Sequence, residues 1–263
     1  MKRRDFLKVG SAGLAGSILG SVGLIAWTPR AQAATISKTF YITDGFITQP
    51  DGVNVYFRGF SPSSNSLAVP GEQLVVQQGD TTYTLTIELQ QGDTVRITIV
   101  NTLGTSHSFK IDGVVDSGRI SGGQTRTIEF QANDPGSYLY YDARNAPYNR
   151  LVGLHGGFAV MPAGSDNELY PGSPTFVQQY FWVFHDVDPA WHNAIRNRRT
   201  PGTAYTPRYF TLNGLSARPP GAPGAHDPAV DSMADPRSAL HGHVGDRALI
   251  RVLNPGMCQQ SVH

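Results

Sequence analysis

The chain has 263 residues, of which 29 are glycine, 18 are proline and one is cysteine, and its formal net charge is +1. Its 21 basic and 20 acidic side chains form no basic stripe of the kind that phosphate backbones require, which argues against nucleic-acid binding. The glycines and prolines are too scattered for a disordered chain, and the lone Cys258 cannot form an internal disulfide.

Residues 1–33 are typical of a cleaved export signal. They contain the arginine pair Arg3 and Arg4, a stretch rich in glycine, alanine and leucine, and a final small-x-small cleavage pattern at residues 31–33. Residues 6–8 (FLK) extend the match to a twin-arginine signal, and an ordinary secretory signal with a chance arginine pair is the alternative. We therefore expect a periplasmic or secreted protein. No second long apolar run follows, so no membrane span is expected after cleavage.

Alternating apolar and polar residues predict strands over residues 82–89, 94–100 and 124–130, each followed or preceded by turn-forming residues. Residues 158–161 and 176–187 predict two further strands, residues 190–199 a short helix or an irregular segment, and residues 241–254 a last strand. Many short strands separated by glycine and proline are typical of an all-β sandwich or barrel.

Two segments far apart in the chain are alike. GDTVRITIVN at residues 92–101 matches GDRALIRVLN at residues 245–254, and FYITDG at 40–45 matches YFTLNG at 209–214 in the same order. A histidine follows each longer match, His107 in one case and His263 in the other. An internal repeat of this kind predicts two related structural units.

The repeat and the loop-forming stretches divide the chain into four segments. We predict a signal peptide at 1–33, a first domain at 34–162, a connecting segment at 163–207 and a partial second domain at 208–263. The second unit is much shorter than the first, and residues 216–238 are poor strand material. Half a sandwich leaves an apolar face and a sheet edge uncovered, so the pattern indicates that the chain stops within the second domain.

The order of motifs resembles a cupredoxin domain, as in multicopper oxidases and copper nitrite reductase-like proteins. The motifs are HSFKIDG from His107, SGGQTRTIEF at 121–130, DPGSYLYY at 134–141 and GLHGGFAVMP at 153–162. The resemblance implies an all-β, cupredoxin-like Greek-key β-sandwich, with one complete domain plus the first part of a second. It also implies copper as the cofactor. In the full-length protein it implies one-electron oxidation of a small-molecule or metal-ion substrate, coupled to reduction of dioxygen.

The metal motifs of the family are incomplete in this chain. Where His-x-His is usual, His107 is followed by Phe109, and the later histidine-rich motif matches residues 139–143, which contain no histidine. Residues 140–156 lack the cysteine and methionine of a blue-copper loop, and Leu154 stands where the methionine would fall. The first domain is therefore expected to have lost its own mononuclear site, and this polypeptide alone is expected to show no oxidase turnover.

Three histidines remain candidate metal ligands. His107 is either a copper ligand or a hydrogen-bonded structural residue, and His155 could reach an interdomain or intersubunit copper. His263 stands where the family counterpart runs into a His-x-His motif. One histidine cannot hold copper alone, so the remaining ligands at His107 or His155 would have to come from another chain. We therefore expect a homo-oligomer with intersubunit copper sites. The sequence assigns no catalytic residue.

The remaining histidines and the cysteine are interpreted as structural. His185 and His192 have a spacing that fits no regular metal face. His241 and His243 would share one face of a strand, but the matching positions of the first unit carry no ligands. Cys258 is interpreted as a buried or idle thiol. Two other functions stay open, a non-catalytic cupredoxin-fold binding module and a periplasmic copper carrier.

Overall fold

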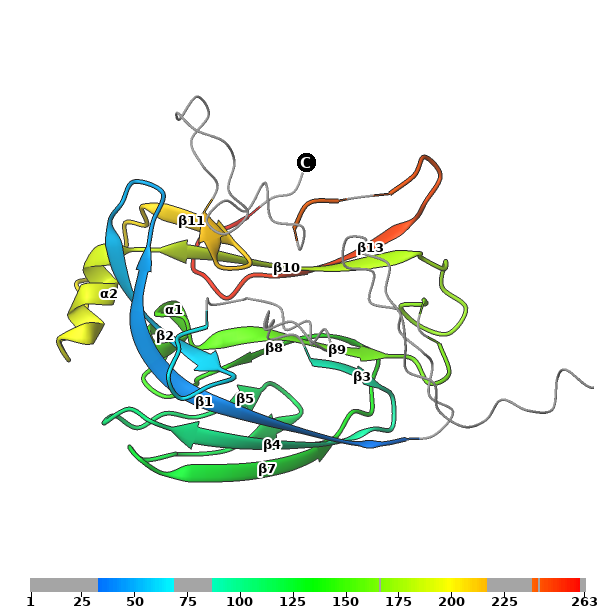
Figure 1. Ribbon diagram of the computed structural model, residues 1–263, viewed down its shortest axis with the longest axis horizontal. Helices are drawn as coiled ribbons and strands as arrows, with labels where there is room; N and C mark the ends of the chain where they lie inside the picture. Colours follow the sequence, from blue (N-terminus) through cyan, green and yellow to red (C-terminus); the bar gives the residue numbers. More distant parts are fainter. Residues whose placement is uncertain (1–32, 69–86, 166, 217–237, 241, 261–263) are drawn as a thin grey trace, which may run out of the picture.

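The computed structural model describes residues 33–68, 87–165, 167–216, 238–240 and 242–260. Four parts lie outside the described residues: positions 1–32 of the predicted signal at 1–33, most of the predicted strand at 82–89, the stretch at 217–237, and His263. The described part contains β1 to β13 and the short helices α1 and α2, arranged in three sheets (Figure 1). No helix in this part is long and apolar enough to cross a membrane.

The first sheet has the strand order β2-β1-β4-β7. Its strands are β1 (Thr35–Thr48), β2 (Asn54–Ser61), β4 (Thr94–Asn101) and β7 (Thr125–Gln131). β1 runs parallel to β4, while the β1–β2 and β4–β7 pairs are antiparallel. The alternation in β4 and β7 is confirmed, because every second side chain of β4 is buried against the core.

The second sheet lies opposite the first and completes a sandwich. Its order is β3-β9-β8-β5-β6, formed by β3 (Ile87–Gln90), β9 (His155–Met161), β8 (Gly136–Tyr141), β5 (Lys110–Ile111) and β6 (Val115–Asp116). A short helix, α1 (Tyr148–Leu151), lies between β8 and β9. Every residue of β9 is buried, because this strand is covered on both faces.

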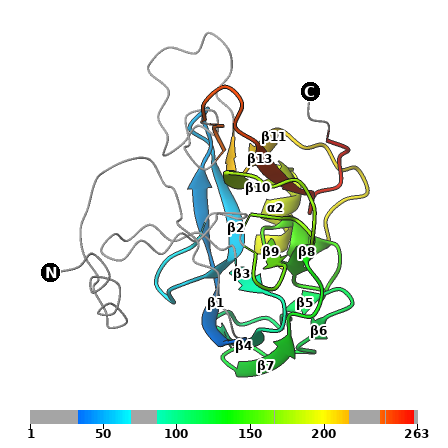
Figure 2. The ribbon, with the colours of Figure 1, turned by 90° about the vertical axis from the view of Figure 1, so that its right-hand side faces the viewer.

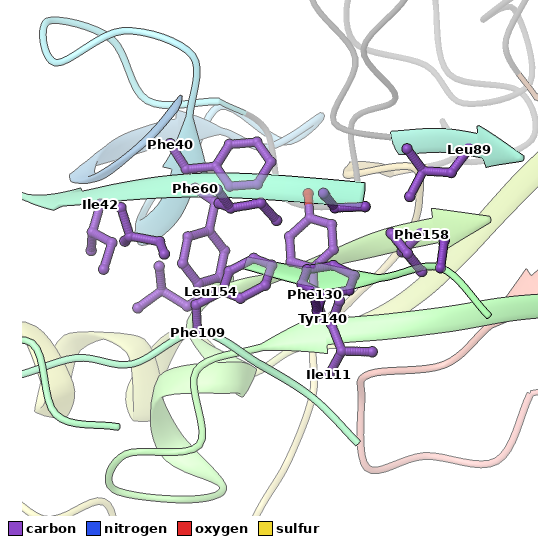
Figure 3. Packing of buried hydrophobic residues seen from close by; sticks show 14 of the residues in the cluster. Phe40, Ile42, Phe60, Leu89, Phe109, Ile111, Phe130, Tyr140, Leu154 and Phe158 are labelled. Atoms are coloured by element: carbon purple, nitrogen blue, oxygen red, sulfur yellow. The ribbon is translucent and has the colours of Figure 1, made fainter. Parts of the chain in front are cut away.

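The core between these two sheets is strongly aromatic (Figure 3). The Tyr140 ring stacks on Phe109 with centroids 5.1 Å apart and meets Phe60 edge to face at 5.7 Å. Phe40 packs 5.7 Å from the same tyrosine ring. All four are almost fully buried, and burial of each contributes about 1.5–3 kcal/mol.

The third sheet packs on the outer face of the second (Figures 1 and 2). Its order is β12-β11-β10-β13, formed by β10 (Gln178–Val187), β11 (Tyr209–Leu212), β12 (Leu215–Ser216) and β13 (Ala248–Leu253). The predicted strands at 176–187 and 241–254 are thus confirmed as β10 and β13. Close approach of the two sheets depends on Gly157 in β9, because a Cβ there would overlap the Phe181 ring of β10.

Helix α2 (Pro189–Arg196) follows β10 directly. Asp188 caps its N-terminus by accepting the backbone N–H groups of Ala190 and Trp191, and Pro189 occupies the first turn. The short helix expected in residues 190–199 is therefore confirmed. β10 and α2 both fall inside the segment 163–207, and the domain boundaries themselves stay a prediction.

The repeat is confirmed down to its turns. Asp93 and Asp246 each accept the backbone N–H of the residue three positions earlier, at 3.0 and 2.7 Å. Asn101 and Asn254 each accept the N–H two residues later and donate Nδ2–H to the carbonyl four residues later. The parallel β1–β4 pair is likewise matched by the parallel β10–β13 pair.

The register of the repeat corrects one predicted equivalence. Residues 40–45 lie in β1, whose counterpart by strand pairing is β10, whereas residues 209–214 begin with β11, the counterpart of β2. The match between those two hexapeptides is therefore wrong, because a short apolar strand followed by Asp-Gly or Asn-Gly recurs in both hairpins. The same register places Gln260, not His263, at the position of His107.

Candidate functional site

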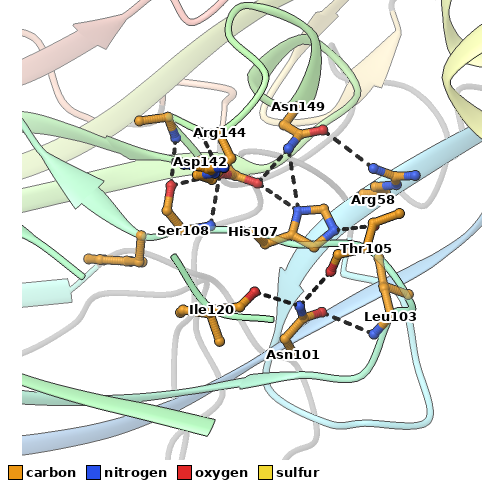
Figure 4. Close-up of polar contacts among 12 residues, drawn as sticks. Arg58, Asn101, Leu103, Thr105, His107, Ser108, Ile120, Asp142, Arg144 and Asn149 are labelled. Carbon is orange, nitrogen blue, oxygen red and sulfur yellow. Dashed lines mark hydrogen bonds and ion pairs between the residues drawn. The ribbon is translucent and has the colours of Figure 1, made fainter. Parts of the chain in front are cut away.

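His107 is fully buried at the end of the sandwich (Figure 4). A single bridge with Ile120 holds its backbone, with N–H to carbonyl distances of 2.9 and 2.8 Å. Its Nδ1 lies 2.6 Å from Oδ2 of Asp142, and its Nε2 lies 2.8 Å from Oγ1 of Thr105. A carboxylate can only accept, so Nδ1–H donates to Asp142, while Nε2 shares its hydrogen bond with the Thr105 hydroxyl.

Asp142 is the centre of this network. Besides His107, its oxygens accept from the backbone N–H and the hydroxyl of Ser108 at 2.9 and 2.8 Å, and from the backbone N–H of Arg144 at 2.8 Å. The Nδ2 amide of Asn149 donates to Oδ2 at 2.9 Å. These donors offset the desolvation cost of a carboxylate that has no exposed surface.

The network continues outward from Asn149, which lies on α1. Its Oδ1 accepts from Nη1 of Arg58 at 3.4 Å, and Nε of Arg58 donates to the Tyr56 hydroxyl at 3.0 Å. That hydroxyl in turn donates to Asp44 at 2.7 Å. Burial raises the pKa of Tyr56, so it remains a neutral donor. The polar chain therefore links the buried His107–Asp142 pair to the edge of the first sheet.

The residues around His107 do not fit a blue-copper ion. Such a site uses two imidazoles, one thiolate and a weak axial thioether. Here His107 is joined by the Asp142 carboxylate and the Asn149 amide, while the Leu154 backbone carbonyl accepts from the N–H of Asp142 at 3.0 Å. Only one of these side chains is a copper ligand of that type, and both of its nitrogens are already hydrogen-bonded.

His155 occupies a different environment at the start of β9. Its Nδ1 donates to the carbonyl of Arg150 at 2.9 Å, and its buried Nε2 has no hydrogen-bond partner. The His185 ring of β10 meets it edge to face at 4.6 Å, and the His192 ring of α2 lies 6.5 Å beyond His185. The structure therefore brings together three histidines from the second sheet, the third sheet and helix α2.

Burial dominates the acid–base properties of these three rings. It lowers the pKa of His155 and of His192 to about 4, and that of His185 well below its usual range. All three imidazoles are neutral at physiological pH. Each ring therefore carries a proton on one nitrogen and a lone pair on the other.

The other candidates differ in exposure. His243 is almost fully exposed beside Asp246, and Cys258 is partly buried with a thiol pKa raised by burial and by Asp186. His241 and His263 lie outside the described residues. Within the described ranges, no three histidine, cysteine or acidic side chains are close enough together, as they stand, to hold a metal ion.

Sequence reasoning missed two features of this region. Asp142 was noted only as a position without a histidine, and its hydrogen bond to His107 spans 35 residues. His185 and His192 were judged by their spacing along the chain, whereas the contact with His155 depends on how β9, β10 and α2 pack. The Asp-Pro pair before α2 was the one local signal that the chain reverses between His185 and His192.

Comparisons with known proteins agree with this architecture. Residues 66–165 match the family model described as multicopper oxidase. The multicopper oxidase mco of Staphylococcus aureus is 35% identical over 83 residues, which cover 26% of this chain and 19% of that protein. The corresponding Staphylococcus epidermidis protein is 34% identical over the same length. The match thus spans about a fifth of these curated relatives.

Solved structures show the same fold at low sequence identity. A copper nitrite reductase from Nitrosomonas europaea superposes with a TM-score of 0.58 at 20% identity, over 84% of this chain and 68% of that one. A blue copper oxidase from the same organism gives a TM-score of 0.61 at 17% identity, over 84% and 61%. The predicted all-β, cupredoxin-like Greek-key sandwich is confirmed.

Proposed function

We propose that this chain is a multicopper oxidase-like protein whose first cupredoxin unit serves as a structural module rather than as a copper centre. The family implies copper as cofactor. Copper bound elsewhere in a complete protein would transfer single electrons from a small-molecule or metal-ion substrate to dioxygen. The described residues of the first unit would stabilise the fold and position the sheets that surround such a centre.

The observation that carries this proposal is the closed hydrogen-bonding around His107. Copper at either imidazole nitrogen would have to displace the Asp142 carboxylate or the Thr105 hydroxyl, at 2.6 and 2.8 Å. Displacing Asp142 would in turn leave the donors of Ser108 and Asn149 unpaired inside the protein. The polar network is therefore complete, and neither imidazole nitrogen of His107 is free to bind copper.

Copper loading of the whole chain tests this proposal. Purified protein would be equilibrated with Cu(II), dialysed, and examined for copper content and for the intense visible band of a copper thiolate. We expect no such band, and we expect His107→Gln to leave the copper content unchanged. His243→Gln is the matched control, because that ring is exposed. Copper that is lost from folded His107→Gln alone would contradict the proposal.

Catalysis offers an independent measurement. We expect this polypeptide to oxidise neither a phenol nor Cu(I) at a rate that follows its copper content, because the ligands of the first unit are replaced. A copper-dependent rate abolished by His107→Gln would favour an oxidase centre at His107. Copper held without turnover, and still dependent on His107, would favour a copper carrier.

We also propose export by the twin-arginine route to the periplasm or the cell exterior. The support is the arginine pair at Arg3 and Arg4 with residues 6–8 behind it. Replacing both arginines by lysine should retain the precursor in the cytoplasm, as fractionation would show. Homo-oligomers with copper between subunits stay a prediction, and neither His107 nor His155 is exposed in this chain.

A further inference from the structure

We propose that His155, His185 and His192 form a buried binding site for one transition-metal ion. The three rings come from β9, β10 and α2 and are each about 1% exposed. This inference is independent of the proposed structural role of the first unit, because it involves none of the residues hydrogen-bonded to His107. Three buried, neutral imidazoles are ligands that suit zinc, copper or cobalt rather than magnesium or calcium.

Two of the rings are already oriented as metal ligands usually are. His155 donates Nδ1–H to the Arg150 carbonyl at 2.9 Å, and His192 donates Nδ1–H to the Tyr56 carbonyl at 2.6 Å. Since a neutral imidazole carries one proton, Nε2 of each ring presents a bare lone pair. Neither Nε2 has a hydrogen-bond partner. A backbone carbonyl that fixes the tautomer in this way is the usual support of a metal-binding histidine.

His185 lies between these two rings and is the least constrained of the three. Neither of its nitrogens has a hydrogen-bond partner, although the Leu151 carbonyl lies near it and near His192. Its centroid is 4.6 Å from His155 and 6.5 Å from His192. Imidazoles that share a tetrahedral ion have centroids roughly 5 Å apart. Binding of one ion would therefore require His185 and His192 to approach each other by roughly 1.5 Å.

The surrounding charges are compatible with a bound cation. Asp186 and Asp188 are buried and their negative charges act on His155 and His192, while Arg150 opposes them. The two carboxylates accept backbone N–H groups at 257–258 and at 190–191, so they supply charge without being ligands. Four buried ring nitrogens without partners are costly in a dry core, and a metal ion would satisfy three of them.

The test uses the whole chain carrying Cys258→Ser and His243→Gln, which removes the thiol and the exposed imidazole as competing ligands. This parent and its His185→Phe derivative would be stripped with a chelator and equilibrated separately with Zn(II), Co(II) and Cu(II). Bound metal per chain would be measured after gel filtration. The visible spectrum of the Co(II) form would report nitrogen coordination. Phenylalanine preserves an aromatic ring at position 185.

We expect the parent to retain one ion per chain and the His185→Phe derivative to bind it at least about tenfold more weakly. Metal should also raise the unfolding temperature of the parent and not that of the derivative. Circular dichroism of the metal-free proteins checks that both are folded. A folded parent that retains no ion, as when ordered water fills the space, would overturn the proposal. Equal binding by the two proteins would do the same.

The outcomes are separable from those of the proposed function. Metal that depends on His185 and not on His107 supports this site and leaves the first unit a structural module. Metal that depends on His107 and not on His185 would contradict both ideas. Should the His185→Phe derivative not fold, His185→Gln would take its place, judged by the same metal content and Co(II) spectrum.

Discussion

Replacing Asp142 by alanine should be among the most damaging single changes in the first unit. The carboxylate has no exposed surface and accepts hydrogen bonds from His107, both donors of Ser108, the backbone of Arg144 and Asn149. Alanine would leave these donors unpaired in the interior. Each buried donor left unsatisfied costs about 1–3 kcal/mol, so the loss should be a large part of a total stability of about 5–15 kcal/mol.

Urea unfolding followed by fluorescence would measure the loss as a lower midpoint with an unchanged slope. Asp142→Asn should be milder, about 1–2 kcal/mol, because the amide oxygen can keep the bonds to Ser108 and Arg144. Asp112→Ala is the matched control, because its exposed contacts with Lys110 and the Tyr141 hydroxyl should contribute little. If Asp142→Ala cost no more than Asp112→Ala, the carboxylate would not be the centre of a stabilising network.

Two further predictions concern the contact between the second and third sheets. Gly157→Ala should destabilise the protein by about 1–3 kcal/mol in urea, because its Cβ would overlap the Phe181 ring, whereas Gly202→Ala, which meets nothing, should have little effect. Equal midpoints for the two variants would show that the sheets can separate without loss. In the metal-free protein, His155 and His192 have pKa values of about 4 when folded, against about 6.5 when unfolded. The unfolded chain therefore binds more protons in this window. The free energy of unfolding should fall as the pH drops from 6.5 to 4, by up to roughly 1.4 kcal/mol per pH unit for each ring. A flat stability profile between these pH values would contradict the burial of neutral imidazoles.

Much of the fold was predictable from local patterns. Alternation located β4 and β7, and the repeated Gly-Asp and Asn positions located β13 and its turns. The parallel pairing of β1 with β4 could not be predicted, because it joins segments separated by a hairpin and carries no local signal. The same limit explains the wrong match between residues 40–45 and 209–214, since strand equivalence is set by pairing partners and not by composition.

The candidate sites also have one part that the sequence predicts and another that only the packing reveals. The absence of cysteine and methionine from residues 140–156 could be read directly from the sequence. The replacement of a metal by hydrogen bonds to Asp142 could not, because it requires His107 and Asn149 to converge from separate elements. The histidine cluster depends equally on packing, with His155 on one sheet and His185 on the next. Spacing along the sequence detects ligands that share one strand or helix, whereas these three histidines lie on three different elements.

The central claim is that the hydrogen-bonded network around His107 offers no ligand set for a blue-copper ion. Anomalous diffraction at the copper edge, from crystals of the whole chain grown with Cu(II), tests it most directly. We predict no anomalous peak within bonding distance of His107, whose Nδ1 and Nε2 should keep Asp142 and Thr105 as partners. A full-occupancy copper peak between His107 and Asp142 would contradict the claim.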